Sequence, residues 1–127
     1  MEIGIIGFGR FGKLLAKLLA EDFKVYVYDN KVKAEESKSK NLVQTSIQEV
    51  CSKDIIIASV PISNFENVLL EIKNLLKEGS LLVDVCSVKE YPVKLMKKIL
   101  PKSVQILATH PLFGPDSLAV NGLRDMP

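Results

Sequence analysis

The sequence is poor in the residues that build metal centres and disulfide frameworks. It contains one histidine, His110, and two cysteines, Cys51 and Cys86, and the three positions are far apart along the chain. Such a sparse set of ligands predicts no metal site. A single pair of cysteines also does not indicate a disulfide framework. We expect both thiols to be buried and reduced, as in a cytoplasmic protein.

Long apolar runs and a large net charge are also missing. No stretch of about 18 apolar residues occurs, which excludes a transmembrane helix, and the chain enters its first apolar run so early that no signal peptide is expected. The net charge is only +2, and aromatic residues do not interleave with the basic ones, so nucleic-acid and membrane partners are not expected. The hydrophobic share of 47% over 127 residues instead indicates one soluble globular domain.

Glycine is scarce as well, with seven residues in all, but four of them lie within the first twelve positions. Gly7, Gly9 and Gly12 have the spacing G-x-G-x-x-G that opens dinucleotide-binding domains. In such a turn the first glycine permits a tight bend, the second lets a pyrophosphate approach the backbone, and the third lets the helix pack closely on the strand. A structural glycine turn without a ligand is the alternative interpretation.

The surroundings of these glycines favour the dinucleotide interpretation. The apolar run Ile3–Ile6 predicts a buried strand before them, and apolar residues at helical spacing from Phe11 onwards predict an amphipathic helix after them. The amino end of that helix would face a phosphate. From this loop we therefore expect the cofactor contacts to come from Gly7, Phe8, Gly9, Arg10, Phe11 and Gly12.

Asp29 is the second part of the predicted cofactor site. It ends a predicted strand over Lys24–Tyr28, about where an acidic residue binds the adenosine ribose hydroxyls. Its charge would repel a 2′-phosphate, which favours NAD over NADP. Lys31 and Lys33 would partly offset that repulsion, so NADP binding stays open. The alternative is that Asp29 only closes a turn.

Six strands alternating with helices predict a Rossmann-like doubly wound parallel sheet of three layers, with strand order 3-2-1-4-5-6. The strands are expected at Ile3–Ile6, Lys24–Tyr28, Leu42–Val43, Asp54–Val60, Leu81–Val85 and Gln105–Thr109. No internal repeat and no second core is found, so the domain is expected to span residues 1–127.

Local signals predict where the later helices begin and end. Capping boxes start at Ser46 and at Ser63, the first opening a short helix to about Cys51. Gly79 is a natural stop for the second of these helices. Pro92 fits the first turn of the next helix. Ser87 has capping-box spacing of its own, but a helix capped there would place Pro92 where an amide hydrogen is needed, so we expect Ser87 in a connecting turn.

Polar residues follow three of the predicted strands. Ser59 and Val60 lie at the carboxyl end of the fourth strand, which Pro61 ends, and Ser87 and His110 follow the fifth and the sixth. Ligands of doubly wound sheets bind outside the carboxyl ends of the strands, so these residues are expected to converge where a nicotinamide would lie. A lone histidine is more often structural than catalytic, and that alternative stays open for His110.

Two segments resemble a known family. Together with the glycine loop, Asp84-Val-Cys-Ser-Val-Lys-Glu-Tyr-Pro92 and Ala108-Thr-His-Pro-Leu-Phe-Gly-Pro115 look like the cofactor domain of the prephenate/arogenate dehydrogenases of tyrosine biosynthesis, most of all the plant arogenate type. The resemblance implies an oxidative decarboxylation of prephenate or arogenate with hydride transfer to NAD(P). It also implies that His110 takes the hydroxyl proton and that Ser87 hydrogen-bonds the same hydroxyl.

The sequence departs from this family in two ways. Asp29 stands where the family's NADP-users have arginine or serine, which again favours NAD. Family members also continue into a helical domain that dimerises and supplies substrate-binding arginines, whereas only Arg10 and Arg124 occur here. We therefore expect residues 1–127 to be the cofactor-binding half of such an enzyme. Alone, this half would bind the cofactor and turn over little substrate.

Two other functions remain possible on the same fold. A nucleotide-sensing regulatory domain, of the kind found in potassium-channel gating rings, would suit the glycine loop. That class does not require the motifs around Ser87 and His110, which favours the dehydrogenase. Another small-acid dehydrogenase or reductase is also compatible, because fold alone does not fix function.

Overall fold

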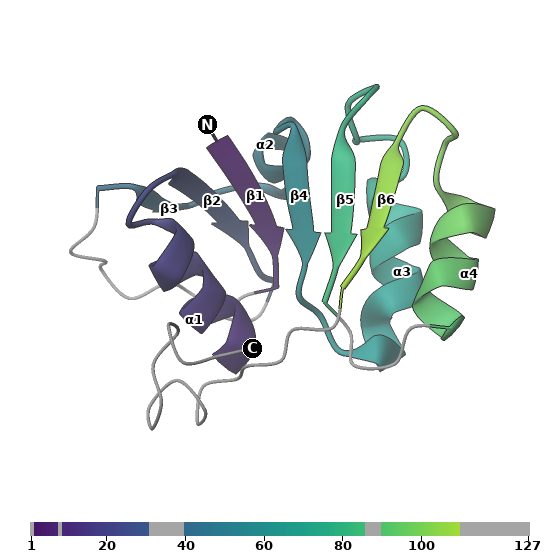
Figure 1. The fold of residues 1–127 in the computed structure, drawn as a ribbon, viewed down its shortest axis with the longest axis horizontal. Helices are drawn as coiled ribbons and strands as arrows, with labels where there is room; N and C mark the ends of the chain where they lie inside the picture. The colour runs from purple at the N-terminus through teal and green to yellow at the C-terminus, as the bar shows by residue number, and fades with distance from the viewer. Residues whose placement is uncertain (1, 8, 31–39, 86–89, 110–127) are drawn as a thin grey trace.

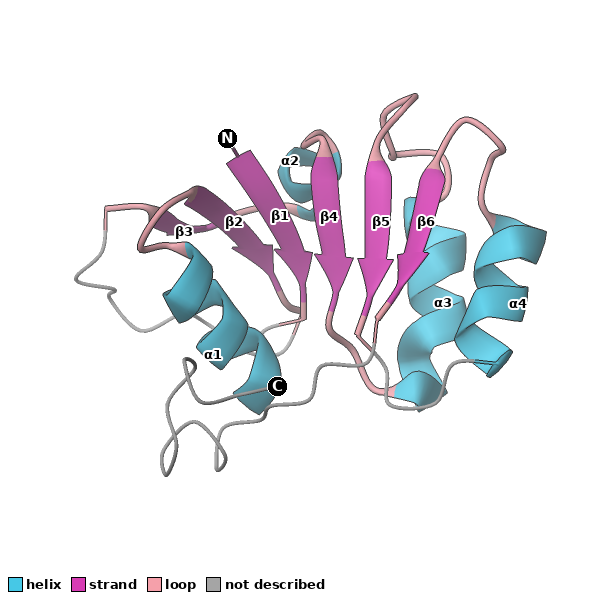
Figure 2. Cartoon of the chain, in the orientation of Figure 1, coloured by secondary structure: helices cyan, strands magenta, loops and turns pink. Residues whose placement is uncertain are grey.

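The computed structural model describes residues 2–7, 9–30, 40–85 and 90–109 of the chain. Within them, strands and helices alternate around one parallel sheet (Figure 1, Figure 2). The strands are β1 (Glu2–Ile6), β2 (Lys24–Tyr28), β3 (Leu42–Gln44), β4 (Ile55–Ala58), β5 (Leu81–Asp84) and β6 (Gln105–Ala108). The helices are α1 (Arg10–Leu19), α2 (Ile47–Cys51), α3 (Ile62–Ile72) and α4 (Glu90–Ile99).

The order of the strands in the sheet is β3-β2-β1-β4-β5-β6, and every neighbouring pair is parallel. This is the predicted order. The chain reverses its direction of travel across the sheet between β1 and β4, so the loops that leave these two strands separate at the carboxyl edge. In doubly wound sheets that point is where ligands bind.

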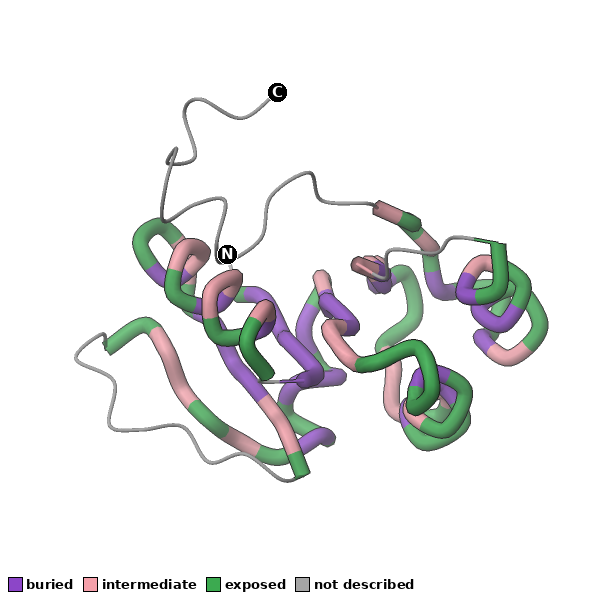
Figure 3. The backbone as a smooth tube through the Cα atoms, turned by 90° about the horizontal axis from the view of Figure 1, so that it is seen from below, coloured by how far each residue is buried: buried purple, intermediate pink, exposed green. Residues whose placement is uncertain are grey.

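Helices cover both faces of the sheet, which gives the three predicted layers. In Figure 1, α1 lies on the near side of the sheet, beside β2 and β1, whereas α3 lies behind β6, with α4 next to it. Buried residues follow the sheet and the inner sides of the helices, while exposed residues lie on the outer sides (Figure 3). The core is accordingly divided in two, with Ile5 in the cluster beneath α1 and Ile6 in the cluster beneath the other helices. The central strand β1 is thus buried on both faces, as its apolar sequence predicts.

The two capping boxes have different outcomes. The first is confirmed, because the Ser46 hydroxyl accepts a hydrogen bond from the Glu49 amide at 3.1 Å as α2 begins. The second is wrong. Helix α3 begins at Ile62, with Pro61 at the N-cap and no side-chain cap, and the Pro61 carbonyl accepts from the Asn64 amide at 2.9 Å. Proline fixes a backbone φ that leads directly into the helix, so Ser63 lies inside the first turn.

The predicted end of α3 at Gly79 is also wrong, whereas the predicted start of α4 is confirmed. Helix α3 ends at Ile72, and the chain continues in turns in which the Leu75 amide donates to the Ile72 carbonyl at 2.8 Å. The turns keep Leu75 and Leu76 against the core, so the apolar spacing outlasts the helix. Pro92 is buried in the first turn of α4.

No helix among the described residues is long and apolar enough to span a membrane.

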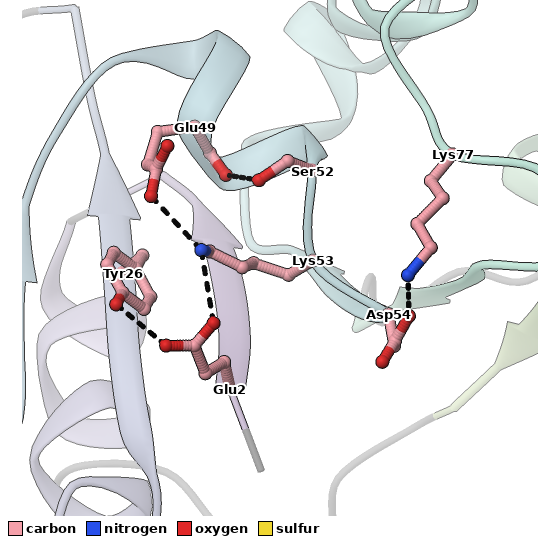
Figure 4. Close-up of polar contacts among 7 residues, drawn as sticks. All are labelled: Glu2, Tyr26, Glu49, Ser52, Lys53, Asp54 and Lys77. Carbon is pink, nitrogen blue, oxygen red and sulfur yellow. Dashed lines mark hydrogen bonds and ion pairs between the residues drawn. The ribbon is translucent and has the colours of Figure 1, made fainter.

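A buried lysine joins three elements at the amino edge of the sheet (Figure 4). The side chain of Lys53 is only 9% exposed, and its ammonium donates to Glu49 at 3.1 Å and to Glu2 at 3.3 Å. The same nitrogen lies 3.9 Å from the centre of the Tyr26 ring, whose hydroxyl donates to Glu2 at 2.8 Å. Lys53 therefore connects the end of α2 to β1 and β2.

These contacts set the pH dependence of the cluster. The hydrogen bonds from Tyr26 and then Lys53 lower the pKa of Glu2, so its stabilising contribution is present above its ordinary pKa of 4.5 and is lost as the pH falls through the lowered value. Burial disfavours the ammonium of Lys53, but hydrogen bonds to Glu49 and Glu2 outweigh it and raise the pKa of Lys53 above its ordinary 10.5. The contribution of Lys53 is therefore lost only as the pH rises through that raised value.

We expect Lys53→Met to lower the free energy of unfolding by about 1–2 kcal/mol, because methionine keeps the apolar stem but loses the ion pairs and the ring contact. Urea denaturation at pH 7 would measure the change. Lys77→Met is the matched control, since Lys77 is paired with Asp54 in solvent, with 54% and 76% of the two side chains exposed, and should cost less than about 0.5 kcal/mol. Equal costs for the two variants would contradict a structural role for Lys53.

Candidate functional site

A cavity of about 410 Å³ opens at the carboxyl ends of β1, β2 and β4. This is the edge of the sheet at which the order of the strands reverses. The cavity is lined by Ile6, Gly7, Gly9, Tyr28, Asp29, Asn30, Ile47, Ser59, Val60, Pro61, Asn64, Asn67, Val68 and Glu71. Segments that are far apart in the sequence, from the glycine loop to α3, therefore share one cavity.

Six of the residues predicted for cofactor binding lie in this lining: Gly7, Gly9, Asp29, Ser59, Val60 and Pro61. Arg10, Phe11 and Gly12 follow directly in the first turn of α1. The described residues do not include Phe8, Lys31, Lys33, Cys86, Ser87, His110 or Arg124. The assignments of Ser87 and His110 to the chemistry therefore remain predictions.

Two of the glycines are required by the packing of the protein itself. Gly7 has φ +101°, a conformation that other residues rarely adopt, and a Cβ there would lie 2.1 Å from the Ser59 carbonyl oxygen. A Cβ on Gly12 would lie 2.2 Å from the carbonyl oxygen of Gly7. The loop is also tied down by hydrogen bonds, because the Gly7 amide donates to Tyr28 and the Ser59 amide to Ile6, both at 2.8 Å. These contacts bring the ends of β1, β2 and β4 together.

Gly9 differs, because the described protein does not require a glycine there. Its φ is −75°, which any residue can adopt, and a Cβ at this position would meet no described atom within 4 Å. Gly9 lines the cavity and is the N-cap of α1, whose first turn carries no acidic residue. The amino end of a helix attracts anions. A glycine here leaves the backbone open to a ligand with a negative charge.

The described residues in the other walls of the cavity supply carboxylates and no ammonium or guanidinium group. Asp29 is half-buried at the end of β2, and Glu71 is exposed on α3. Neither lysine nor arginine occurs among the described lining residues. The described carboxylates therefore disfavour additional negative charge beside them.

Helix α3 is a part of the site that the sequence motifs did not indicate. Asn64, Asn67, Val68 and Glu71 have the spacing i, i+3, i+4 and i+7, so they lie on one face of the helix, and all four line the cavity. The signal was present in the sequence as a mainly polar stripe beside the apolar one formed by Phe65, Leu69 and Ile72. The helix was predicted from the capping-box spacing at Ser63 and from an apolar face that included Val68, and these signals indicate a helix but no ligand site.

Beyond the cavity, β5 and β6 are joined at their carboxyl ends. The backbone amide and the hydroxyl of Thr109 both donate to the Asp84 carbonyl oxygen, at 2.9 and 2.8 Å. Thr109 is the last described residue before His110. These hydrogen bonds to β5 therefore fix the position at which the chain leaves β6.

The described residues provide no alternative chemistry through a metal or a thiolate. They contain no cluster of three or more histidine, cysteine or acidic side chains that could hold a metal ion. Cys51 is a buried free cysteine, and burial, followed by the charge of Glu71, raises the pKa of its thiol to about 11. The thiol is therefore protonated and unreactive at neutral pH.

Comparison with known proteins agrees with this site. Residues 15–125 match the family described as prephenate dehydrogenase, nucleotide-binding domain. Arogenate dehydrogenase 1, chloroplastic, of Arabidopsis thaliana is 32% identical over 98% of this chain, and a probable arogenate/prephenate dehydrogenase of Methanocaldococcus jannaschii is 33% identical over 92%. The chain spans only 21% and 28% of the lengths of these two relatives.

Solved structures agree as well. The prephenate dehydrogenase of A. aeolicus, solved in complex with hydroxyphenyl propionate and NAD+, has a TM-score of 0.70 and 26% identity, and the match covers 88% of this chain and 42% of that one. An imine reductase from Bacillus cereus reaches a TM-score of 0.74 at 18% identity, which shows the shared fold alone.

These matches confirm the resemblance drawn from the motifs at Asp84–Pro92 and Ala108–Pro115, and they favour it over a nucleotide-sensing regulatory domain. The chain belongs to the prephenate dehydrogenase family, of which it carries the nucleotide-binding domain.

Proposed function

We propose that this chain binds NAD, in preference to NADP, as the cofactor half of a prephenate or arogenate dehydrogenase. The observation that carries the proposal is the cavity at the reversal of strand order, where the glycine loop, the start of α1 and Asp29 meet. The absence of a Cβ at Gly9, in a position where the described protein would tolerate one, fits a pyrophosphate held against that backbone.

The lining residues fit the parts of a dinucleotide in order. The amino end of α1 and Gly9 would hold the pyrophosphate, and Asp29 would accept hydrogen bonds from the adenosine ribose. Ser59, Val60 and Pro61 follow β4 and would guide the cofactor towards the ends of β5 and β6. Bound NAD supplies the acceptor for a hydride.

The rest of the reaction is assigned to residues outside the described part of the chain. We propose that His110 accepts the proton of the substrate hydroxyl and that Ser87 orients this hydroxyl by a hydrogen bond. Loss of the proton stabilises the carbonyl that forms as hydride departs, and loss of CO2 then makes the ring aromatic. Formation of NADH with prephenate or arogenate, assayed in a protein that includes the family's helical domain, tests this reaction.

Wild-type chain should bind NAD more tightly than NADP, and Asp29→Ser should narrow that preference by about 1–2 kcal/mol, or roughly 5- to 30-fold. Serine loses the charge that both accepts from the ribose hydroxyls and repels a 2′-phosphate. Fluorescence titration with each cofactor would measure the preference. Asp22→Ser, in an exposed turn outside the cavity, should leave it unchanged. Tighter binding of NADP to the wild-type chain would refute the assignment of Asp29.

Three further features remain proposals. A helical domain beyond the cofactor domain would supply the substrate-binding arginines and the dimer contacts. Residues 1–127 would form the cofactor domain in that arrangement. A cytoplasmic location would fit the buried free thiol of Cys51, although the names of the plant relatives place those proteins in chloroplasts.

A further inference from the structure

The part of the cavity beyond Asp29 is formed by two helices that the glycine motif does not include. Ile47, on α2, and Val68, on α3, contribute apolar surface, while Asn67 and Glu71, also on α3, contribute polar side chains. Ile47 is 7% exposed and belongs to the core, so its position is fixed by packing. This part of the cavity therefore combines apolar surface with an amide and a carboxylate.

Glu71, on α3, lines the same cavity as Ile47, on α2. The charge of Glu71 also contributes, after burial, to the raised pKa of Cys51, which lies one turn beyond Ile47 on α2. Glu71 is exposed and not packed into the core. Its carboxylate can therefore contact a ligand in the cavity that Ile47 also lines.

This inference rests on the proposed binding of NAD. With the pyrophosphate at the start of α1 and the ribose at Asp29, the purine base continues past Asp29, into the space between α2 and α3. A purine has two apolar faces and a polar edge, which correspond to Ile47 and Val68 and to the polar groups of α3. We infer that Glu71 selects the adenine base of the cofactor by accepting a hydrogen bond from its exocyclic amine.

The chemistry of the carboxylate makes the selection directional. An ionised glutamate only accepts hydrogen bonds, so it pairs with the 6-amino group of adenine. A 6-oxo purine presents a carbonyl oxygen at the same place, and two acceptors facing each other repel. Glutamine, in contrast, carries both a donor and an acceptor and can turn either one towards the base. Glu71→Gln should therefore lose the selection while keeping the shape of the site.

The test uses nicotinamide hypoxanthine dinucleotide, in which a carbonyl replaces the adenine amine. We expect the wild-type chain to bind NAD about 5- to 30-fold more tightly than this analogue, and Glu71→Gln to bring the ratio close to one. Glu66→Gln is the matched control, because Glu66 is an exposed glutamate of α3 that does not line the cavity. It should retain the wild-type ratio. Circular dichroism would verify that both variants are folded.

Each outcome separates this inference from the proposed function. Equal affinity of the wild-type chain for the two dinucleotides, or an unchanged ratio in Glu71→Gln, would overturn the role of Glu71 while NAD binding itself stands. Failure of the folded wild-type chain to bind either dinucleotide would overturn the proposed function and this inference together. A ratio that collapses equally in Glu66→Gln would show a general effect of helix charge and would also overturn the inference.

Discussion

Replacing His110 with asparagine should lower turnover by roughly 10²–10⁴, in a protein that includes the family's helical domain, while NAD affinity stays nearly unchanged. Asparagine keeps a polar side chain of similar reach but does not accept a proton at neutral pH. Imidazole suits this role, because its ordinary pKa of about 6.5 leaves it mostly neutral at pH 7 yet basic enough to take the hydroxyl proton. Steady-state formation of NADH with prephenate or arogenate would measure the loss.

The pH profile and a second variant distinguish catalysis from structure. Wild-type turnover should fall as the pH drops through the pKa of His110, because the protonated ring has no free electron pair to accept the proton. Ser87→Ala should cost less than His110→Asn, since orienting the hydroxyl is only part of the effect. Near-normal turnover of His110→Asn, or loss of NAD binding together with activity, would make His110 a structural residue of its turn.

Gly12→Ala should lower the free energy of unfolding by about 2–4 kcal/mol. The new methyl group would lie 2.2 Å from the carbonyl oxygen of Gly7, and backbone on both sides prevents an inexpensive adjustment. Such a loss is a large part of the 5–15 kcal/mol that holds a typical domain folded. Urea denaturation would measure it, and a loss below about 1 kcal/mol would show that α1 can move away from the loop.

Gly9→Ala is the matched substitution, because the same methyl group would meet no described protein atom there. Its cost in unfolding free energy should stay below about 1 kcal/mol, the scale on which alanine is worse than glycine at an N-cap. Its affinity for NAD should nevertheless fall at least tenfold, since the methyl group occupies the approach of the pyrophosphate. Unchanged NAD affinity in Gly9→Ala would contradict the placement of the pyrophosphate at this residue.

Most of the fold could be predicted because its signals are local. Apolar runs mark each strand, and the glycine loop fixes the first crossover, from which the strand order follows. The bounds of α3 could not be predicted in the same way. Pro61 starts the helix without the hydroxyl of Ser63, and turns after Ile72 keep the apolar spacing going. In both cases a second backbone geometry, a proline start or a series of turns, places the same side chains on the core as the predicted helix would.

The residues of the site that belong to a sequence motif could be predicted. The residues that reach the site only through tertiary contacts were missed. Asp29 and Gly9 belong to a recognisable spacing, but Glu71 resembles any exposed glutamate of a surface helix. Lys53 likewise resembles a surface lysine, but in the fold Glu2 of β1 and Tyr26 of β2 contact it. Such contacts between distant residues cannot be predicted from a single sequence, because no local pattern distinguishes the residues that make them.

The pairing of β1 with β4 also ties ligand binding to folding as a whole. Ile3 pairs with Ile55 and Ile6 with Ala58, so this seam joins segments about fifty residues apart, and the cavity draws its lining from both sides of it. Neither half of the sheet contains the site alone. A dinucleotide that occupies the cavity would therefore bind only the assembled state, and mass action would convert its affinity into resistance of the whole sheet to unfolding, about 2.7 kcal/mol at a concentration one hundred times Kd.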